Sequence, residues 1–394
     1  MRQFWGRGNE TDPAAGAGRK GSVRDALRAA IARGDAGPPF GDTVGPWVRH
    51  EGDVGIDDES AFDHPGGYIA GDDLVCAVNT ALLLGKPLLL TGNPGTGKSQ
   101  LAERVAWEFN LGPLLRFESQ SLSEAQDLYY RYDLVGRLAA VEAFRAEQGL
   151  LDAGARKGGG KELSVARYLG FGPLGKAILR ANPAQLDRLI ERGFSPAGLQ
   201  APAAARPSVV LIDEIDKTSR DFPNDLLNAI ERKEFAVREL DDGLIRAPDD
   251  EDLQPIVLIT SNSERELPAP FLRRCIYFHI PDPSREMLAR ILRSRVTGTG
   301  EGDDPTRLHP LFADVLEMFS TFRETSARKL AYQPGTSELL DLARAMRSSG
   351  RIDPQAGLSA KANHGELMST VSTLIKHRDD RSELDRLLQR WAPG

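Results

Sequence analysis

Cysteine is scarce in this chain of 394 residues, which contains only Cys76 and Cys275. Two cysteines this far apart supply neither a disulfide framework nor the ligand set of a structural zinc site. Chains without structural disulfides are typical of reducing compartments. We therefore expect a reduced, cytoplasmic setting.

Long uninterrupted apolar runs are also missing. The most apolar stretch, residues 74–90, is broken by Asn79, Lys86 and Pro87, whereas a membrane-spanning helix needs about 20 predominantly apolar residues. Residues 1–7 lack the apolar core of a signal peptide. The sequence predicts no membrane span.

An excess of basic residues is absent as well. Lysine and arginine total 50 against 57 aspartates and glutamates, which gives a formal net charge of −7. Proteins dedicated to duplex binding usually carry a basic face. The charge balance argues against nucleic acid as a partner, although a local basic channel stays open.

Residues 1–65 show little hydrophobic periodicity and are rich in glycine, alanine, proline and charge. Such segments bury too little apolar surface to fold, so we predict a largely disordered N-terminal arm. Within it, residues 22–34 form a possible short helix that Ser22 would cap, with apolar residues on one face. That helix would dock either on the rest of the chain or on a partner protein.

From residue 67 on, short apolar runs alternate with helical patterns. Such runs are typical of strands that are buried on both faces of a parallel sheet. The predicted strands cover residues 87–91, 114–118, 208–212, 255–260 and 275–280. Residues 66–281 are therefore predicted to form an α/β domain with a parallel five-stranded sheet, interrupted by an insertion at about 155–206.

No strand pattern follows residue 281. Helical patterns continue to the end of the chain, and the last of them places Leu384, Leu387 and Leu388 on one face. Residues 282–394 are thus predicted to form a small all-α domain.

The strongest motif in the chain is a phosphate-binding loop that matches G-x-x-x-x-G-K-[ST] in full. Its members are Gly92, Asn93, Pro94, Gly95, Thr96, Gly97, Lys98 and Ser99. The glycines let backbone N–H groups surround phosphate oxygens at the start of a helix. Lys98 would reach the β- and γ-phosphates, and the Ser99 hydroxyl would bind Mg²⁺. We predict nucleoside triphosphate binding here.

A second motif places two carboxylates at the end of an apolar strand. Asp213 and Glu214 follow the run at 209–212, and ligands of open α/β sheets bind at the carboxyl ends of the strands. Asp213 is a candidate Mg²⁺ ligand. Glu214 is a candidate general base that polarises water for attack on the γ-phosphate. Asp216 and Lys217 are expected to form local pairs and are assigned no chemistry.

The next apolar strand, at 256–261, also leads to a polar residue, Asn262. If this strand lies beside the one that ends in Asp213, Asn262 would sit near the γ-phosphate and orient the attacking water. The alternative is an asparagine that forms a turn at a strand end.

Two adjacent arginines, Arg273 and Arg274, precede the last predicted strand. An arginine at a subunit edge can stabilise charge on a phosphoryl group that is transferred in a neighbouring subunit. The alternative is a solvated surface pair.

These features, in this order, resemble an AAA+ ATPase over about residues 67–391. Within that superfamily the chain is most similar to the MoxR group. The segments that carry this group-level similarity are 77–82, 87–92, 172–174, 210–217, 222–231 and the hairpin at 235–244. The resemblance implies an AAA+ α/β core with a helical lid, ATP and Mg²⁺ as cofactors, and Arg274 in the place of the usual arginine finger.

The resemblance also implies a homo-oligomeric ring, most simply a hexamer. Such a ring would couple ATP hydrolysis to remodelling or maturation of a partner protein in a chaperone-like role. The partner is often a protein with a von Willebrand A domain.

One segment departs from the MoxR pattern. The lid of that group usually supplies an arginine near a helix start, but residues 335–339 read Gly-Thr-Ser-Glu-Leu. Arg328 and Arg344 lie nearby in sequence, yet neither fits the motif. The departure weakens the expected coupling between lid and nucleotide.

Two other functions stay open at this stage. One is a DNA-processing motor, such as a restriction-type GTPase subunit. The other is a scaffold that assembles on nucleotide and turns over slowly. The aromatic segments 129–132 and 168–172 are expected to pack in the core, with a role in lining a central pore as the alternative.

Overall fold

The computed structural model describes residues 62, 64–109, 111–150, 165–192, 194, 205–240, 243–296, 304, 306–326 and 330–391. The candidate helix at 22–34, most of the predicted N-terminal arm and part of the predicted insertion lie outside these residues. In the described part of the chain, no helix is both long and apolar enough to cross a membrane.

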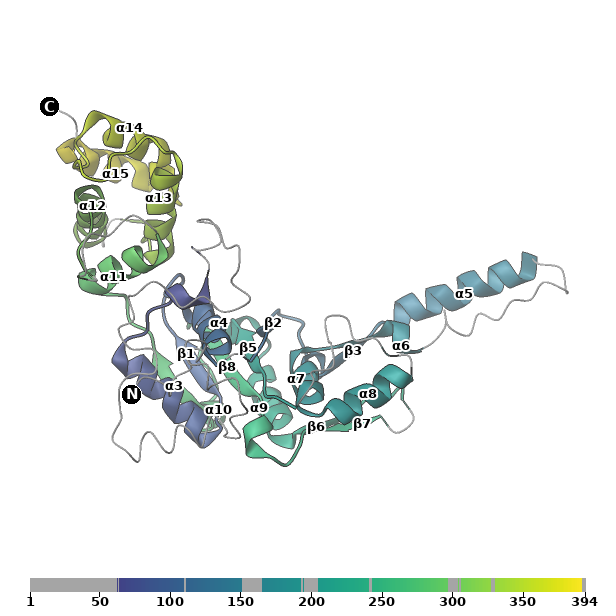
Figure 1. Ribbon diagram of the computed structural model, residues 1–394. Coiled ribbons are helices and arrows are strands. Elements are labelled where there is room, and N and C mark those ends of the chain that lie inside the picture. Colours follow the sequence, from purple (N-terminus) through teal and green to yellow (C-terminus); the bar gives the residue numbers. More distant parts are fainter. Residues whose placement is uncertain are drawn as a thin grey trace, which may run out of the picture.

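Five parallel strands form the central sheet (Figure 1). They are β1 (Leu88–Thr91), β2 (Leu115–Glu118), β5 (Val209–Asp213), β8 (Ile256–Ser261) and β9 (Ile276–His279). Their order across the sheet is β2-β5-β8-β1-β9, which places the phosphate-loop strand between β8 and β9. The predicted fold class, an α/β core with five parallel strands followed by helices, is confirmed.

Helices cover both faces of the sheet because successive strand residues point to opposite sides. The covering helices are α3 (Asp72–Leu84), α4 (Lys98–Glu108), α7 (Pro173–Ala181) and α9 (Phe222–Arg232). Leu88 and Leu90 of β1 pack in the core shared with α3 and α4, while Leu89 packs in the core shared with α7 and α9. This double burial explains why β1 reads as a continuous apolar run.

A side excursion leaves the core between β2 and α7. It contains the antiparallel pair β3 (Tyr130–Tyr132) and β4 (Leu169–Phe171), the long helix α5 (Leu134–Leu150) and the short α6 (Val165–Tyr168). Helix α5 projects away from the sheet (Figure 1). The excursion therefore starts well before residue 155, where the insertion was expected. The sequence analysis did not predict β3, β4 or α5.

Four further short elements lie in the described residues of the α/β part. Helix α8 (Pro183–Glu191) follows α7. Strands β6 (Glu234–Ala236) and β7 (Leu244–Arg246) form the expected antiparallel hairpin. Helix α10 (Ala269–Leu272) precedes β9.

The chain ends in a bundle of helices with a core of its own. Its members are α11 (Arg285–Arg295), α12 (Pro310–Ser326), α13 (Thr336–Ser348), α14 (Lys361–Thr370) and α15 (Arg381–Leu388). Phe312, Phe319 and Phe322 of α12 are at the centre of this core and are almost fully buried. We call this bundle the lid; in Figure 1 it stands beside the α4 side of the sheet.

Candidate nucleotide site

The phosphate loop connects β1 to α4 and depends on glycine at its tightest points. Gly97 has φ +84°, and a Cβ there would lie 2.9 Å from the Tyr68 ring. A Cβ on Gly92 would lie 2.6 Å from the carbonyl oxygen of Ile280. Any other residue at either position would strain the backbone or displace its neighbour. The loop is therefore packed tightly between the segment before α3 and the end of β9.

Lys98 starts α4 and is buried, with a relative exposure of 7%. Its Nζ donates hydrogen bonds to the carbonyl oxygens of Gly92 at 2.8 Å and Asn93 at 2.9 Å. Burial lowers the pKa of Lys98, and the carboxylates that follow β5 oppose that shift. The ammonium group is thus held at the centre of the loop by the loop's own backbone.

Three oxygen-bearing side chains meet beside the loop. The Ser99 hydroxyl donates to Asp213 Oδ1 at 2.8 Å, and the Thr260 hydroxyl donates to the same oxygen at 2.6 Å. These are hard oxygen donors of the kind that Mg²⁺ prefers. In the described part of the chain, no group of three His, Cys, Asp or Glu side chains could hold a metal alone. That donor set fits Mg²⁺, which is usually bound through one or two carboxylates, water and substrate phosphates.

Glu214 follows Asp213 and adopts a left-handed backbone conformation, with φ +57°. Its Oε1 accepts a hydrogen bond from Asn262 Nδ2 at 3.1 Å, and its Oε2 pairs with Lys217 Nζ. Non-glycine residues in this conformation are uncommon and cluster at functional sites. The structure thus brings together the two side chains that the sequence analysis assigned to water activation.

Lys217 pairs locally, but with Glu214 rather than with Asp216. Asp216 is buried and accepts hydrogen bonds from the backbone N–H groups of Asn262 and Glu264. Lys217 turns to Glu214 instead, and that contact raises the pKa of Lys217. The side chains of adjacent residues point in different directions after the strand, so Asp216 and Lys217 find different partners although they are neighbours in the sequence.

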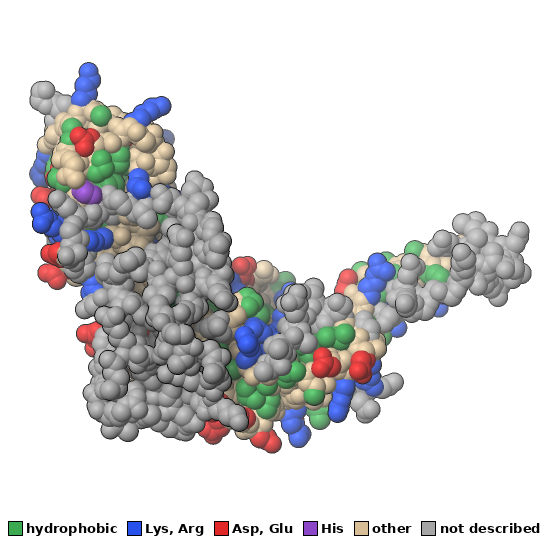
Figure 2. Space-filling model, viewed as in Figure 1, with side chains coloured by type: hydrophobic (Ala, Val, Ile, Leu, Met, Phe, Trp, Pro, Cys, Tyr) green, Lys and Arg blue, Asp and Glu red, His purple; other side chains and the backbone are tan. Residues whose placement is uncertain are grey.

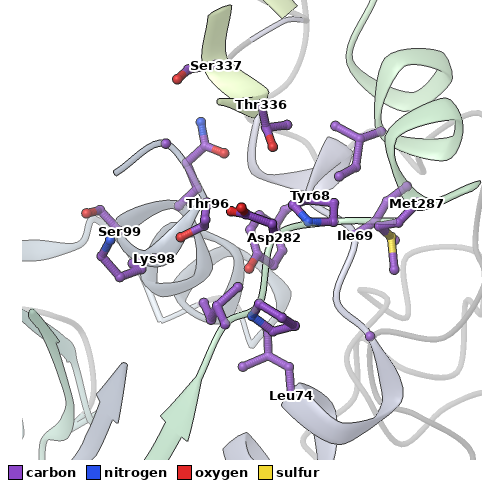
Figure 3. Close-up of a pocket in the computed structure, with 18 of the residues that line it drawn as sticks. Tyr68, Ile69, Leu74, Thr96, Lys98, Ser99, Asp282, Met287, Thr336 and Ser337 are labelled. Atoms are coloured by element: carbon purple, nitrogen blue, oxygen red, sulfur yellow. The ribbon is translucent and has the colours of Figure 1, made fainter. Parts of the chain in front are cut away.

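A cavity of about 730 Å³ lies between the sheet and the lid, and its size suits a nucleotide. The polar residues that line it are Lys98, Ser99, Asp213, Glu214, Thr260 and Asn262. One wall is apolar, where Tyr68, Ile69 and Leu74 face Met287 (Figure 3). Tyr68 is buried, and burial raises its pKa. The cavity therefore has a polar end at the phosphate loop and an apolar end that could receive a base.

The lid reaches the cavity through the start of α13. Thr336 and Ser337 line it, and a Cβ on Gly95 would lie 2.5 Å from the Ser337 hydroxyl oxygen. The Glu338 carboxylate caps this helix start by accepting from the Gly335 N–H and the Ser337 hydroxyl. At the place where the resemblance would put an arginine, the lid presents hydroxyl groups to the phosphate loop.

Arg273 and Arg274 lie apart from this cluster. Both are exposed, at the C-terminal side of α10, and neither is among the residues that line the cavity. Arg274 forms an ion pair of 3.4 Å with Glu231, and both side chains are about half exposed. The other predicted site residues converge, whereas these two arginines face another surface.

The aromatic segments of the excursion are largely packed. Tyr129, Tyr130 and Phe171 are buried, and their rings lie 4.7 to 6.4 Å from the Phe235 ring. Tyr129 also donates its hydroxyl hydrogen bond to the Ala229 carbonyl.

Three polar residues at or next to this site carry no sequence signal. Thr260 gives no signal because it lies inside an apolar strand. Asp282 lines the cavity from the linker after β9, and Arg323 of α12 pairs with it at 2.7 Å. No local pattern marks such contacts, since Arg323 and Asp282 are 41 residues apart.

Residues 87–275 match the AAA domain family, dynein-related subfamily. No curated protein matches the chain. Among solved structures, the chain is similar to C. elegans PCH-2, with 17% sequence identity and a TM-score of 0.39 over 80% of this chain and 72% of that one. The matched family region contains every residue of the phosphate loop together with Asp213, Glu214, Asn262, Arg273 and Arg274.

Proposed function

We propose, from the match of residues 87–275 to the AAA domain family, that this chain is a ring-forming, Mg²⁺-dependent ATPase that remodels a partner protein. The observation that carries the proposal is the convergence of Lys98, Ser99, Asp213, Glu214 and Asn262 on one cavity. Positioning and charge stabilisation account for most of the catalysis of phosphoryl transfer. These residues supply the groups that such catalysis needs.

Each of these residues has a distinct role in the proposed reaction. Lys98 and the N-terminus of α4 bind the β- and γ-phosphates. Ser99 and Asp213 would hold Mg²⁺, which supplies positive charge against the phosphate oxygens when it is bound. Glu214 accepts a proton from the attacking water, and Asn262 holds Glu214 Oε1 toward it.

Arg274 is proposed to act in a neighbouring subunit. It lies on an exposed surface away from its own cavity, so a second copy of the chain could receive it. A guanidinium group supplied in trans stabilises charge on the transferring phosphoryl group. Arg273 is the alternative for this role.

The MoxR-like role and the hexameric ring rest on the sequence resemblance. The proposed client is a protein, and one with a von Willebrand A domain is the first candidate. A Glu214→Gln variant is expected to bind ATP without hydrolysing it and so to retain the client. The test is co-purification of bound proteins with the wild type and with Glu214→Gln. Recovery of the same protein with both, in larger amount with the variant, would support this role.

The two alternative functions, a DNA-processing motor and a slow assembly scaffold, predict different features of the surface and of the site. A DNA motor needs a basic path, but the formal net charge is −7, and the described residues on the face in Figure 2 carry interspersed basic and acidic side chains. A slow scaffold would need no general base, yet Glu214 and Asn262 are in contact.

A phosphate-release assay with and without duplex DNA tests these possibilities. The proposed function predicts hydrolysis that depends on ATP and Mg²⁺ and does not respond to DNA. Strong stimulation by DNA would favour the motor. Tight ATP binding with negligible phosphate release, even in the assembled ring and with client present, would favour the scaffold.

A further inference from the structure

A lid arginine is linked to the phosphate loop through a carboxylate in the linker between sheet and lid. Arg323, near the end of α12, places Nη2 2.7 Å from Asp282 Oδ2. Asn93 of the phosphate loop donates from Nδ2 to both oxygens of the same carboxylate, at 3.2 and 3.3 Å. We call these three side chains the Asn93–Asp282–Arg323 bridge.

The Arg323 end of the bridge is well shielded from water. Its side chain is 15% exposed, and its Nε is buried with no hydrogen-bond partner among the described residues. The guanidinium carbon lies 5.7 Å from the centre of the Phe319 ring. The Asp282 side chain is 40% exposed, so the ion pair is shielded on its arginine side only, and solvent and salt screen it less than a fully exposed pair. Its loss should therefore have a measurable effect.

Asp282 occupies a position where its charge matters for an anionic ligand. It lines the same cavity as Lys98 (Figure 3), and it contacts the phosphate loop through Asn93. An unpaired carboxylate there would repel a triphosphate. Arg323 neutralises it from the lid side.

Asp282 lies in the linker between β9 and α11, so a movement of the lid also moves this end of the bridge. Pro281 and Pro283 flank Asp282, and each proline ring fixes its own φ. Asp282 therefore has little freedom to adjust independently of the linker. Asn93 is engaged at both ends, because its carbonyl oxygen accepts from Lys98 Nζ while its side chain holds Asp282.

We propose that the Asn93–Asp282–Arg323 bridge couples the phosphate loop to the lid, and that Arg323 also promotes triphosphate binding by neutralising Asp282. This inference rests on the proposed ATP-binding function. Phosphates that attract the Lys98 ammonium change its contact with the Asn93 carbonyl, and the bridge passes that change to α12. A ligand shifts the position of the lid only if the protein binds it with different affinities in the two lid positions.

Through the bridge, a lid arginine is connected to the phosphate loop. The lid segment at 335–339 contains no arginine that could make such a connection. Arg295 of α11 also lines the cavity, but it donates to the carbonyl oxygens of Phe62 and His64 and to Gln100. Arg323 instead contacts a carboxylate that is itself bound to the phosphate loop. For this reason Arg323 is the stronger candidate for a positioning residue.

The test separates the charge effect from the mechanical effect. ATP affinity is measured by equilibrium titration, and lid movement by energy transfer between dyes on the exposed Cys76 of α3 and on Ser382→Cys of α15. Labelled chains are diluted into unlabelled chains so that only transfer within one subunit is seen. The variants are Arg323→Gln, Asp282→Asn and the double variant. Arg285→Ala is the matched control, because Arg285 forms an exposed ion pair of 3.6 Å between α11 and α12.

The expected results differ between the two readouts. Arg323→Gln should weaken ATP binding about fivefold or more, a value at the low end for couplings between sites, and should abolish the ATP-dependent change in energy transfer. Asp282→Asn should abolish the change in energy transfer without weakening ATP binding. The double variant should bind ATP like the wild type, since both charges are gone, yet still show no change in energy transfer. Arg285→Ala should match the wild type in both readouts.

Each part of the inference can fail separately. Wild-type energy-transfer behaviour in Arg323→Gln and Asp282→Asn would overturn the coupling. Affinity as low in the double variant as in Arg323→Gln would overturn the charge effect. If the wild type itself does not bind ATP, it is the proposed function that fails. Asp282→Asn is nearly isosteric, so it tests the coupling even if Arg323→Gln folds poorly.

Discussion

Lys98 is the single residue on which phosphate binding depends most directly. Its ammonium group is buried among loop carbonyls, and a charge-assisted hydrogen bond contributes about 1.5–3 kcal/mol. Lys98→Ala should therefore weaken ATP binding about 10- to 100-fold. Lys86→Ala is the control, since Lys86 is exposed and lies before β1. Equal affinities of the two variants in a titration would remove the phosphate role from this loop.

A substitution of the single residue Glu214 separates ATP binding from ATP hydrolysis. Glu214→Gln keeps the size and hydrogen-bonding capacity of the side chain but cannot accept a proton. Phosphate release should fall by about 10²–10⁴, while ATP affinity stays near that of the wild type. The measurement is single-turnover phosphate release beside an equilibrium titration.

Lys217 helps to interpret that result, because it pairs with Glu214 in the structure. Lys217→Ala is the accompanying control for loss of the ion pair alone. Normal hydrolysis by Glu214→Gln would assign the base to a different group.

At the scale of elements, the lid has its own apolar core and should behave as a separate cooperative unit. Phe312 of α12 is fully buried in this core. Phe312→Ala should destabilise the lid by about 3–5 kcal/mol through lost contacts and a residual cavity. Hydrogen exchange should speed up across α12 and α13 while the amides of the sheet keep their protection.

Met368→Ala in α14 is the control, since Met368 is 41% exposed and such a change usually costs less than about 0.5 kcal/mol. Equal loss of protection in sheet and lid after Phe312→Ala would show that the two unfold together.

At the scale of the whole molecule, catalysis is proposed to need more than one subunit. Arg274 contacts Glu231 on an exposed surface, away from its own phosphate loop. Arg274→Ala should bind ATP almost normally and hydrolyse it slowly, because an arginine supplied in trans is worth about 10³–10⁵ in rate. Mixing Arg274→Ala with Lys98→Ala subunits should restore part of the activity, since some interfaces then pair an intact loop with an intact arginine.

The mixing experiment has two checks. Native mass spectrometry must show that mixed rings form, and Arg273→Ala is mixed with Lys98→Ala in parallel. Mixed rings that contain Arg274→Ala and stay inactive would place Arg274 in its own subunit's site or in a structural role. Recovery that instead depends on Arg273 would transfer the trans role to it.

Features of this protein that depend on contiguous residues could be predicted before its structure was known. Residues 88–90 and 209–212 are apolar at every position and pack into both helical layers, so burial on both sides of a sheet could be read directly from them. The phosphate loop was predicted in full because its backbone geometry requires glycines at fixed spacing. By contrast, α5 was missed because it projects from the core and leaves Leu134, Val135 and Leu138 exposed, so it carries no clear buried face.

Contacts between residues that are distant in the sequence follow from the three-dimensional fold. Ser99 and Asp213 are 114 residues apart and meet because β5 and β1 both flank β8. Thr260 joins them at the end of that central strand. Asp282 and Arg323 carry no motif, and their pairing follows from how α12 packs against the linker after β9. Local patterns report the environment of a segment, whereas partners across the fold are selected by strand order and helix packing, which no short stretch of sequence encodes.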